Sequence, residues 1–179
     1  MTVGTPIAQA QFAEMFRIFR ESAFHLETRE FYAMTYERDA FQRFLDGRPL
    51  PPSGLPWWQA WLDEMRELTR QGKRIGRVRL LSEPPSDYQR WELWGTSWHI
   101  EAGEEIRYMS RRRAEQIGLP LEYDWWLFDD EQLIITRFTD VGEIAEKSLI
   151  TDPGIIARHR EWRDLAVRNA TTAEKFAAA

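Results

Sequence analysis

Three arginines flank a short proline-containing segment: Arg77 and Arg79 precede it, and Arg90 follows it. Arg77 and Arg79 alternate with Val78 and Leu80, a period of two that predicts a strand over residues 74–81. Residues 82–87 contain two prolines and predict a loop, and residues 88–99 are expected to form a second strand. If these strands pair across the loop, alternate side chains share one face in any register that preserves parity. That face would carry Arg77, Arg79, Tyr88, Arg90, Glu92 and Trp94.

In this hairpin Arg79 would lie opposite Arg90, and two facing cations are unfavourable unless an anion lies between them. Guanidinium groups bind carboxylates and phosphates through paired hydrogen bonds. The face therefore predicts either a surface that recognises an anionic group or an internal network of salt bridges. The carboxylates available for such a network are those of Glu83, Asp87, Glu101, Glu104, Asp124 and Asp129.

A small enzyme is an alternative use of the same region. Glu83 and Asp87 flank the Pro-Pro bend and could act as general acid and base, with Tyr88 or His99 assisting. The three histidines of the chain are isolated from one another and match no metal-binding spacing, and no phosphate-binding glycine loop is present. We therefore expect neither a metal nor a cofactor.

A second basic cluster, formed by Arg111, Arg112 and Arg113, directly follows Ser110, which is expected to cap a short helix. Positive charge at a helix N-terminus opposes the helix dipole. The cluster is therefore interpreted either as a solvated helix end or as a second basic patch that attracts an anion.

Composition restricts the class of protein. The chain has 179 residues, 24 basic and 29 acidic side chains, a net charge of −5 and no cysteine, which excludes disulfides and thiolate metal sites. Arginine outnumbers lysine by 21 to 3, but the overall charge is acidic, so direct binding to nucleic acid is not expected. No apolar stretch approaches the ~20 residues that span a bilayer. We expect a cytoplasmic protein that does not enter membranes.

Hydrophobic periodicity predicts helices near the N-terminus, over residues 57–71 and from residue 153 to about residue 170. A compact aromatic run over residues 30–36 suggests a strand, and further strands are expected over residues 104–109, 124–128, 132–138 and 143–150. The expected fold is α+β, an antiparallel meander of five or six strands with the helices packed on it. We expect one domain over residues 1–179, comprising an N-terminal helical region (1–46), a proline-rich connector (47–56) and a main body (57–172).

Several short segments together resemble a known family. These segments are Arg77–Arg79, Ser82–Pro84, Asp87–Tyr88, Arg90, Glu92, Ala102–Glu104, Ile106–Arg107, Asp124–Asp129, Thr151–Asp152 and Trp162–Asp164. The family is an uncharacterised actinobacterial domain of unknown function, often encoded beside helix-turn-helix regulators of the phage-repressor type. The resemblance implies a regulatory or toxin–antitoxin-like context and supplies no catalytic residues.

Three functions follow from these observations as hypotheses. The first is a non-catalytic interaction or ligand-sensing module that works with a helix-turn-helix regulator and binds an anionic group through the arginine face. The second is a metal-independent enzyme acting on an anionic metabolite or nucleotide. The third is a homo-oligomer anchored by some of the nine tryptophans.

Overall fold

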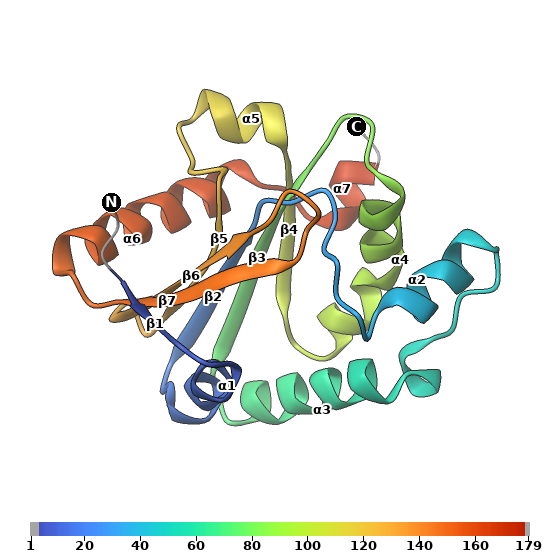
Figure 1. Ribbon diagram of the computed structural model, residues 1–179, viewed down its shortest axis with the longest axis horizontal. Helices are drawn as coiled ribbons and strands as arrows, with labels where there is room; N and C mark the ends of the chain where they lie inside the picture. Colours follow the sequence, from blue (N-terminus) through green and yellow to red (C-terminus); the bar gives the residue numbers. More distant parts are fainter. Residues whose placement is uncertain (1–3, 178–179) are drawn as a thin grey trace.

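The computed structural model describes residues 4–177, and these form a seven-stranded sheet covered by helices on both faces (Figure 1). The strand order is β1-β7-β6-β5-β2-β3-β4. Strands β2, β3 and β4 run parallel to one another, whereas β1, β7, β6, β5 and β2 pair antiparallel. The strands are β1 (Thr5–Pro6), β2 (Ser22–Glu27), β3 (Arg74–Leu81), β4 (Glu105–Ser110), β5 (Asp124–Phe128), β6 (Gln132–Phe138) and β7 (Ile144–Ile150). The helices are α1 (Gln9–Ile18), α2 (Arg38–Leu45), α3 (Pro56–Arg70), α4 (Asp87–Glu101), α5 (Arg111–Gln116), α6 (Pro153–Asn169) and α7 (Ala173–Ala177), with a 3-10 turn at Pro52–Gly54.

The α+β class is confirmed, but the expected antiparallel meander is wrong because the sheet is mixed. Two parallel crossovers cause the difference: α3 connects β2 to β3, and α4 connects β3 to β4 (Figure 1). A parallel connection requires a crossover of this kind, whereas a meander uses short hairpins. The hairpin of β5 and β6 is the antiparallel pair that the sequence predicted correctly.

The largest error concerns residues 88–99, which were expected to be a strand and instead lie in helix α4. Ser86 caps this helix by accepting a hydrogen bond from the Gln89 amide, and the Gln89 side chain completes a capping box. Buried Tyr88, Trp91 and Gly95 recur at helical spacing on the face of α4 that meets the core. The aromatic residues of this segment are typical of a strand, but the N-cap and the 3.6-residue spacing of the buried residues specify a helix.

A smaller correction concerns the N-terminal region. The expected strand over residues 30–36 is absent; the strand there is β2, at Ser22–Glu27, which lies in the sheet between β5 and β3. Thr5 and Pro6 pair with β7, and α1 begins at Gln9. Residues 28–36 form a segment without strand pairing.

Two apolar cores occupy the two faces of the sheet. On one face, α1, α3 and α4 pack on Ala23, Ile75, Trp126 and Phe128. On the other, α5 and α6 pack on a set that includes Phe24, Leu26, Val78, Leu80 and Trp125. Neighbouring residues of one strand belong to opposite cores because side chains alternate along a strand. The same alternation places the polar residues of β2 and β3 on the first face.

Candidate functional site

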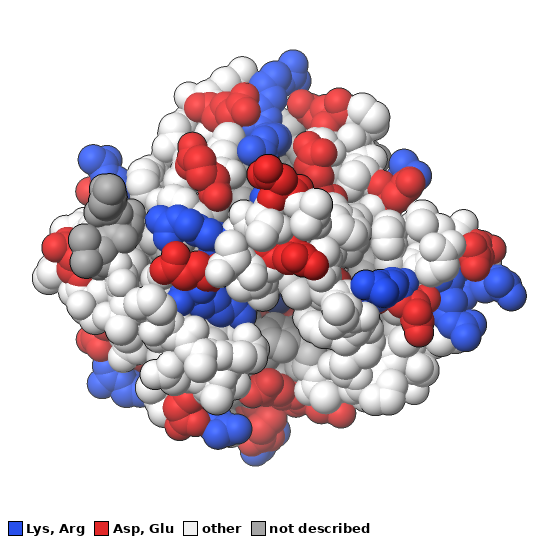
Figure 2. Space-filling model, in the orientation of Figure 1, with Lys and Arg blue, Asp and Glu red and all other residues white. Residues whose placement is uncertain are grey.

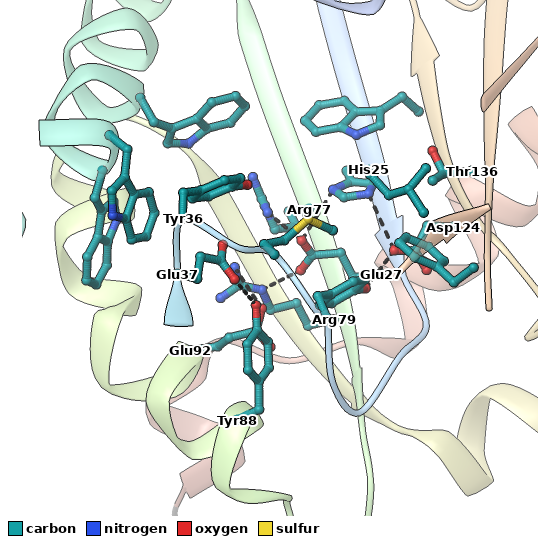
Figure 3. A pocket seen from close by; sticks show the side chains of 18 of the residues that line it. His25, Glu27, Tyr36, Glu37, Arg77, Arg79, Tyr88, Glu92, Asp124 and Thr136 are labelled. Atoms are coloured by element: carbon teal, nitrogen blue, oxygen red, sulfur yellow. Dashed lines mark hydrogen bonds and ion pairs between the residues drawn. The ribbon is translucent and has the colours of Figure 1, made fainter. Parts of the chain in front are cut away.

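A cavity of about 570 Å³ lies between the first face of the sheet, helices α3 and α4, and the segment of residues 28–37 (Figure 3). Its volume is within the range typical of small-molecule sites. The walls are aromatic, and the side against the sheet is charged. The residues that line it are Gln9, Phe12, His25, Glu27, Tyr32, Met34, Tyr36, Glu37, Trp57, Trp58, Trp61, Arg77, Arg79, Tyr88, Trp91, Glu92, His99, Asp124, Trp126, Thr136, Phe138, Ile144 and Lys147.

The floor of the cavity is a buried ion pair network on β2 and β3. The parallel register places His25 beside Arg77 and Glu27 beside Arg79. Glu27 accepts hydrogen bonds from both arginines: from Arg77 Nη1 to Oε1 at 2.5 Å, and from Arg79 Nε to Oε2. Glu27 is 7% exposed, so its charge is compensated by two guanidinium groups rather than by water. Burial would raise the pKa of Glu27, but Arg77 and Arg79 outweigh it and hold that pKa well below its usual range.

Behind this floor, Glu104 connects the network to the tryptophans of α3. Arg77 Nη2 donates to Glu104 at 3.0 Å, His99 Nδ1 donates to it at 2.6 Å, and the Trp61 indole donates to it at 2.8 Å. The Trp58 indole in turn donates to His99 Nε2 at 2.9 Å, which places the proton of this neutral histidine on Nδ1. Burial lowers the pKa of His99, consistent with the neutral ring. Burial would raise the pKa of Glu104, but Arg77 and the His99 hydrogen bond lower it to about 2.

One end of the cavity is formed by His25 and Asp124, which Figure 3 shows beside Thr136. The His25 ring stacks on Trp126 at a centroid distance of 4.3 Å, and its Nε2 lies 3.9 Å from Asp124 Oδ2. Asp124 accepts hydrogen bonds from the Tyr32 hydroxyl at 2.6 Å and from both the backbone amide and the hydroxyl of Thr28 at 2.8 Å. Burial raises the pKa of Asp124 to about 7, although these hydrogen bonds oppose the shift. Burial lowers the pKa of His25 to about 3, so its ring is neutral at pH 7.

The opposite end contains two more carboxyl groups, Glu37 and Glu92 (Figure 3). The Tyr88 hydroxyl donates to Glu37 Oε2 at 2.6 Å, and Arg79 Nη2 lies 3.5 Å from Glu92 Oε1. Burial raises the pKa of Glu37 to about 7 despite the Tyr88 hydrogen bond. Burial also raises the pKa of Glu92 to about 8, with Arg79 opposing.

Three buried nitrogen atoms of the floor lack a hydrogen-bond partner among the described residues: His25 Nδ1, Arg77 Nε and Arg79 Nη1. His25 Nδ1 is 3.4 Å from Glu27 Oε1 but does not form a hydrogen bond with it. Buried polar atoms are usually paired, so the side chains of the floor do not fully satisfy one another.

The structure brings together only some of the side chains that the sequence singled out. Arg77, Arg79, Tyr88, Glu92 and His99 all line the cavity, although Tyr88 and Glu92 come from a helix and not from a paired strand. The expected hairpin face is not formed, because β3 pairs with β2 and β4 on its two edges.

The remaining predicted site residues lie outside the cavity. Arg90 is exposed on α4 and pairs with Asp87 one turn earlier, and Glu83 forms an exposed pair with Arg112 at 3.5 Å. Trp94 packs among Phe44, Trp58 and Trp98 between helices. Glu83 and Asp87 are therefore not placed to act on a molecule in the cavity.

The cluster Arg111–Arg113 does not form one patch. Ser110 caps α5 as predicted, by accepting from the Arg113 amide. Arg111 donates to the Thr28 carbonyl at 2.7 Å, and Arg113 donates to Asn169 at 2.7 Å, so the three side chains diverge. On the face in Figure 2, basic and acidic side chains are interspersed and no continuous basic surface is formed.

Sequence reasoning missed His25, Glu27 and Glu37. The first two form a polar alternation with Phe24 and Leu26, the same period-two signal that identified β3, but the short strand was assigned to the wrong residues. Glu37 comes from a segment without regular structure, and no local pattern could place it in a cavity. Asp124 was considered only as an internal counterion.

Comparison with known families settles membership. Residues 10–178 match the model of a family described as a domain of unknown function, DUF6879. The chain belongs to this family. No curated protein matches the DUF6879 chain at a significant level.

Two solved structures are similar to the DUF6879 chain at low sequence identity. A phospholipase D family member, Nuc from Salmonella typhimurium, is 12% identical, with a TM-score of 0.53 over 92% of this chain and 90% of that chain. TrmBL2, an archaeal chromatin protein, is 9% identical, with a TM-score of 0.49 over 93% of this chain and 51% of that chain. At 12% identity, the likeness to Nuc concerns the fold alone.

The described residues contain neither a metal-binding cluster nor a membrane-spanning helix. Among residues 4–177, no group of three or more His, Asp and Glu side chains is arranged to hold a metal ion. No helix in the described part of the chain is long and apolar enough to cross a bilayer.

Proposed function

We propose that the DUF6879 chain is a ligand-sensing module that binds a small organic molecule in the cavity between the sheet and helices α3 and α4. The single observation that supports it is an aromatic-walled cavity of about 570 Å³ over a buried charged network of Glu27, Arg77 and Arg79. A folded chain that served only as a scaffold would be expected to fill such a space with side chains. The aromatic walls favour a ligand with a flat apolar part.

The arginines contribute to this site differently from the sequence-based expectation. Arg77 and Arg79 are 7% and 6% exposed; they donate hydrogen bonds to Glu27 and Glu104, and Arg79 also forms an ion pair with Glu92. Binding of an outside anion by this pair stays a prediction, and it would have to compete with these internal carboxylates.

A regulatory partner remains part of the proposal. The family resemblance implies a helix-turn-helix regulator as partner, and ligand binding against residues 28–37 offers a way to signal occupancy to it. This part is tested by copurification of the chain with the regulator encoded beside it, with and without ligand. The alternative of a tryptophan-anchored homo-oligomer has less support, because all nine tryptophans lie among the described residues and are buried or half-buried.

An enzyme that uses the same cavity is the second candidate, favoured by one observation. Glu37 and Glu92 have pKa values of about 7 and 8 and face the cavity, which suits general acid–base catalysis near neutral pH. Conversion of a bound molecule that is lost in Glu37→Gln and retained in Glu83→Gln would favour this candidate over a binding module.

Binding is tested with tryptophol, a neutral indole alcohol, by isothermal titration calorimetry. At a ligand efficiency of ~0.3 kcal/mol per non-hydrogen atom, we expect a Kd of about 2 mM or tighter. Met34→Trp places a bulky indole ring in the cavity and should abolish binding. Leu45→Trp adds the same ring at an exposed position of α2 outside the cavity and should leave binding unchanged. No binding to the wild type, or equal binding to the two variants, would refute the proposal.

A further inference from the structure

The end of the cavity at Glu37 and Glu92 combines carboxyl groups with aromatic rings. Tyr36 adjoins Glu37 in the chain, and its ring contacts Trp57 at a centroid distance of 5.2 Å; Trp57 stacks on Trp58 at 5.8 Å. Figure 3 shows Tyr36, Glu37, Glu92 and Tyr88 gathered at this end, away from His25 and Asp124. Aromatic faces and carboxylates both attract cations.

We infer that this end of the cavity receives the positively charged group of a small organic amine, with Glu37 and Glu92 as its counterions and the rings of Tyr36, Trp57 and Trp58 around it. This inference rests on the proposed function and names the chemical class of the ligand.

The balance of charge in the cavity supports a cation. Its lining holds four carboxyl groups, Glu27, Glu37, Glu92 and Asp124, and two buried guanidinium groups. Both guanidinium groups are already engaged by Glu27, and Arg77 also by Glu104, which lies behind the floor. Lys147, the remaining basic side chain of the lining, donates to Gln9 and lies 4.1 Å from the Phe12 ring centroid. Arg79 Nη2 also lies 3.5 Å from Glu92, so Glu37 and Asp124 are the carboxyl groups of the lining that form no ion pair with Lys or Arg among the described residues.

Two carboxyl groups at this end of the cavity can lose their protons near neutral pH. Glu37 and Glu92 have pKa values of about 7 and 8, so an arriving cation can displace their protons at little cost. His25 has a pKa of about 3, so an arriving anion could not recruit a proton there. The charged and titratable groups that face Glu37 are Tyr88 and Glu92 from α4, Arg79 from β3, Glu27 from β2 and Tyr36 from its own segment.

Three probes of equal skeleton test the charge of the ligand. Tryptamine is a cation, tryptophol is neutral and indole-3-acetate is an anion at pH 7.5. We expect tryptamine to bind about tenfold tighter than tryptophol, as a partly desolvated cation–π and carboxylate site would give, and indole-3-acetate to bind weakest. At pH 6.5, tryptamine binding should release protons, detected as a dependence of the observed heat on the ionisation enthalpy of the buffer, whereas tryptophol binding should not.

Variants assign the effect to this end of the cavity. Glu37→Gln should reduce the affinity for tryptamine to that for tryptophol without changing tryptophol binding, and Glu92→Gln repeats the test should Glu37→Gln unfold. Glu83→Gln removes an exposed carboxylate outside the cavity and should change neither affinity.

The outcomes separate this inference from the proposed function. Equal binding of tryptamine and tryptophol overturns the amine while the ligand-binding function stands. Tightest binding of indole-3-acetate also overturns it and assigns the arginines the leading role. If none of the three probes binds, both the inference and the proposed function fail.

Discussion

Both faces of the sheet carry an apolar core, but the face of α1, α3 and α4 also carries a buried charged network and a cavity. On the α5–α6 face, Leu26, Val78 and Leu80 pack into a closed apolar core. On the α1–α4 face, the adjacent residues Glu27, Arg77 and Arg79 form the floor of a cavity. The alternation of side chains along β2 and β3 therefore separates stability from binding at the level of neighbouring residues. The face of α1, α3 and α4 keeps a cavity over a buried charged network.

The largest expected effect comes from removing the centre of that network. Glu27→Ala leaves two buried guanidinium groups without their shared counterion, and the free energy of unfolding should fall by about 3–5 kcal/mol. Urea denaturation measures this loss. A loss below about 1 kcal/mol would mean that the network is solvated, and the contrast between the faces would be weaker than described.

A cavity in the opposite face should lower stability without altering the site. Leu80 is 2% exposed, and Leu80→Ala should cost about 3 kcal/mol, within the range for buried leucines. Its affinity for tryptophol at a temperature where it is folded should equal that of the wild type. A change in affinity would show that the two faces are coupled.

The pH dependence of stability should differ between the carboxyl groups of the floor and those of the cavity walls. The pKa of Glu92 is raised to about 8 in the folded chain, so its unfolded form loses the proton first as pH rises from about 4.5. Glu92 therefore lowers stability progressively between that pH and pH 8. Glu92→Gln, which stays neutral, should be as stable as the wild type at pH 5 and about 1–3 kcal/mol more stable at pH 8.

For Glu104, behind the floor, the pH dependence of stability has the opposite sign. The pKa of Glu104 is lowered to about 2, so the stability it contributes is present above pH 4.5 and is lost as pH falls toward 2. Thermal melts of the wild type and of Glu92→Gln, measured from about pH 2 to about pH 8, distinguish the loss of stability at low pH from the loss at high pH. A Glu92→Gln variant that gains nothing at pH 8 would show that Glu92 is ionised in the fold.

A smaller effect is expected where helix α4 approaches the cavity wall. A Cβ atom on Gly95 would lie 2.6 Å from the Trp58 ring, so Gly95→Ala must displace that ring. We expect a loss of about 1–2 kcal/mol in stability, as for overpacked cores, together with altered affinity for tryptophol. Unchanged affinity, measured by calorimetry, would mean that the ring of Trp58 does not shape the ligand site.

The smallest effect is expected at Arg90. Its side chain is exposed and pairs only with neighbouring Asp87, so Arg90→Ala should change stability by less than ~0.5 kcal/mol and leave probe binding unaltered. Arg79→Ala is the matched contrast from the buried network. If Arg90→Ala weakens binding as strongly as Arg79→Ala, the arginine pair predicted from the sequence acts together after all.

The sequence predicted those parts of the fold that depend on local periodicity. The helix at residues 57–71, the hairpin of β5 and β6 and the cap of α5 by Ser110 are all present. Residues 88–99 were misassigned because a helix crowded with aromatic residues resembles a strand in composition, and the capping box at Ser86 and Gln89 was overlooked. That one error converted a parallel crossover into a hairpin.

The candidate site could be predicted only in part, for a different reason. Arg77 and Arg79 were correctly placed on one face of a strand, since parity is a local property. Their partner Glu27 lies 50 residues or more away in the chain and meets them through parallel pairing, which no local pattern specifies. Glu37 and Asp124 reach the cavity in the same non-local manner.

The most direct test of the account uses the nine tryptophans as reporters on both faces. Their indole N–H resonances are followed by NMR during titration with tryptophol. Signals of the cavity tryptophans, Trp57, Trp58, Trp61, Trp91 and Trp126, should shift, while those of Trp125 and Trp162 in the opposite core stay in place. Shifts confined to Trp125 and Trp162, or no shift in any cavity tryptophan at saturating probe, would contradict the assignment of the ligand site.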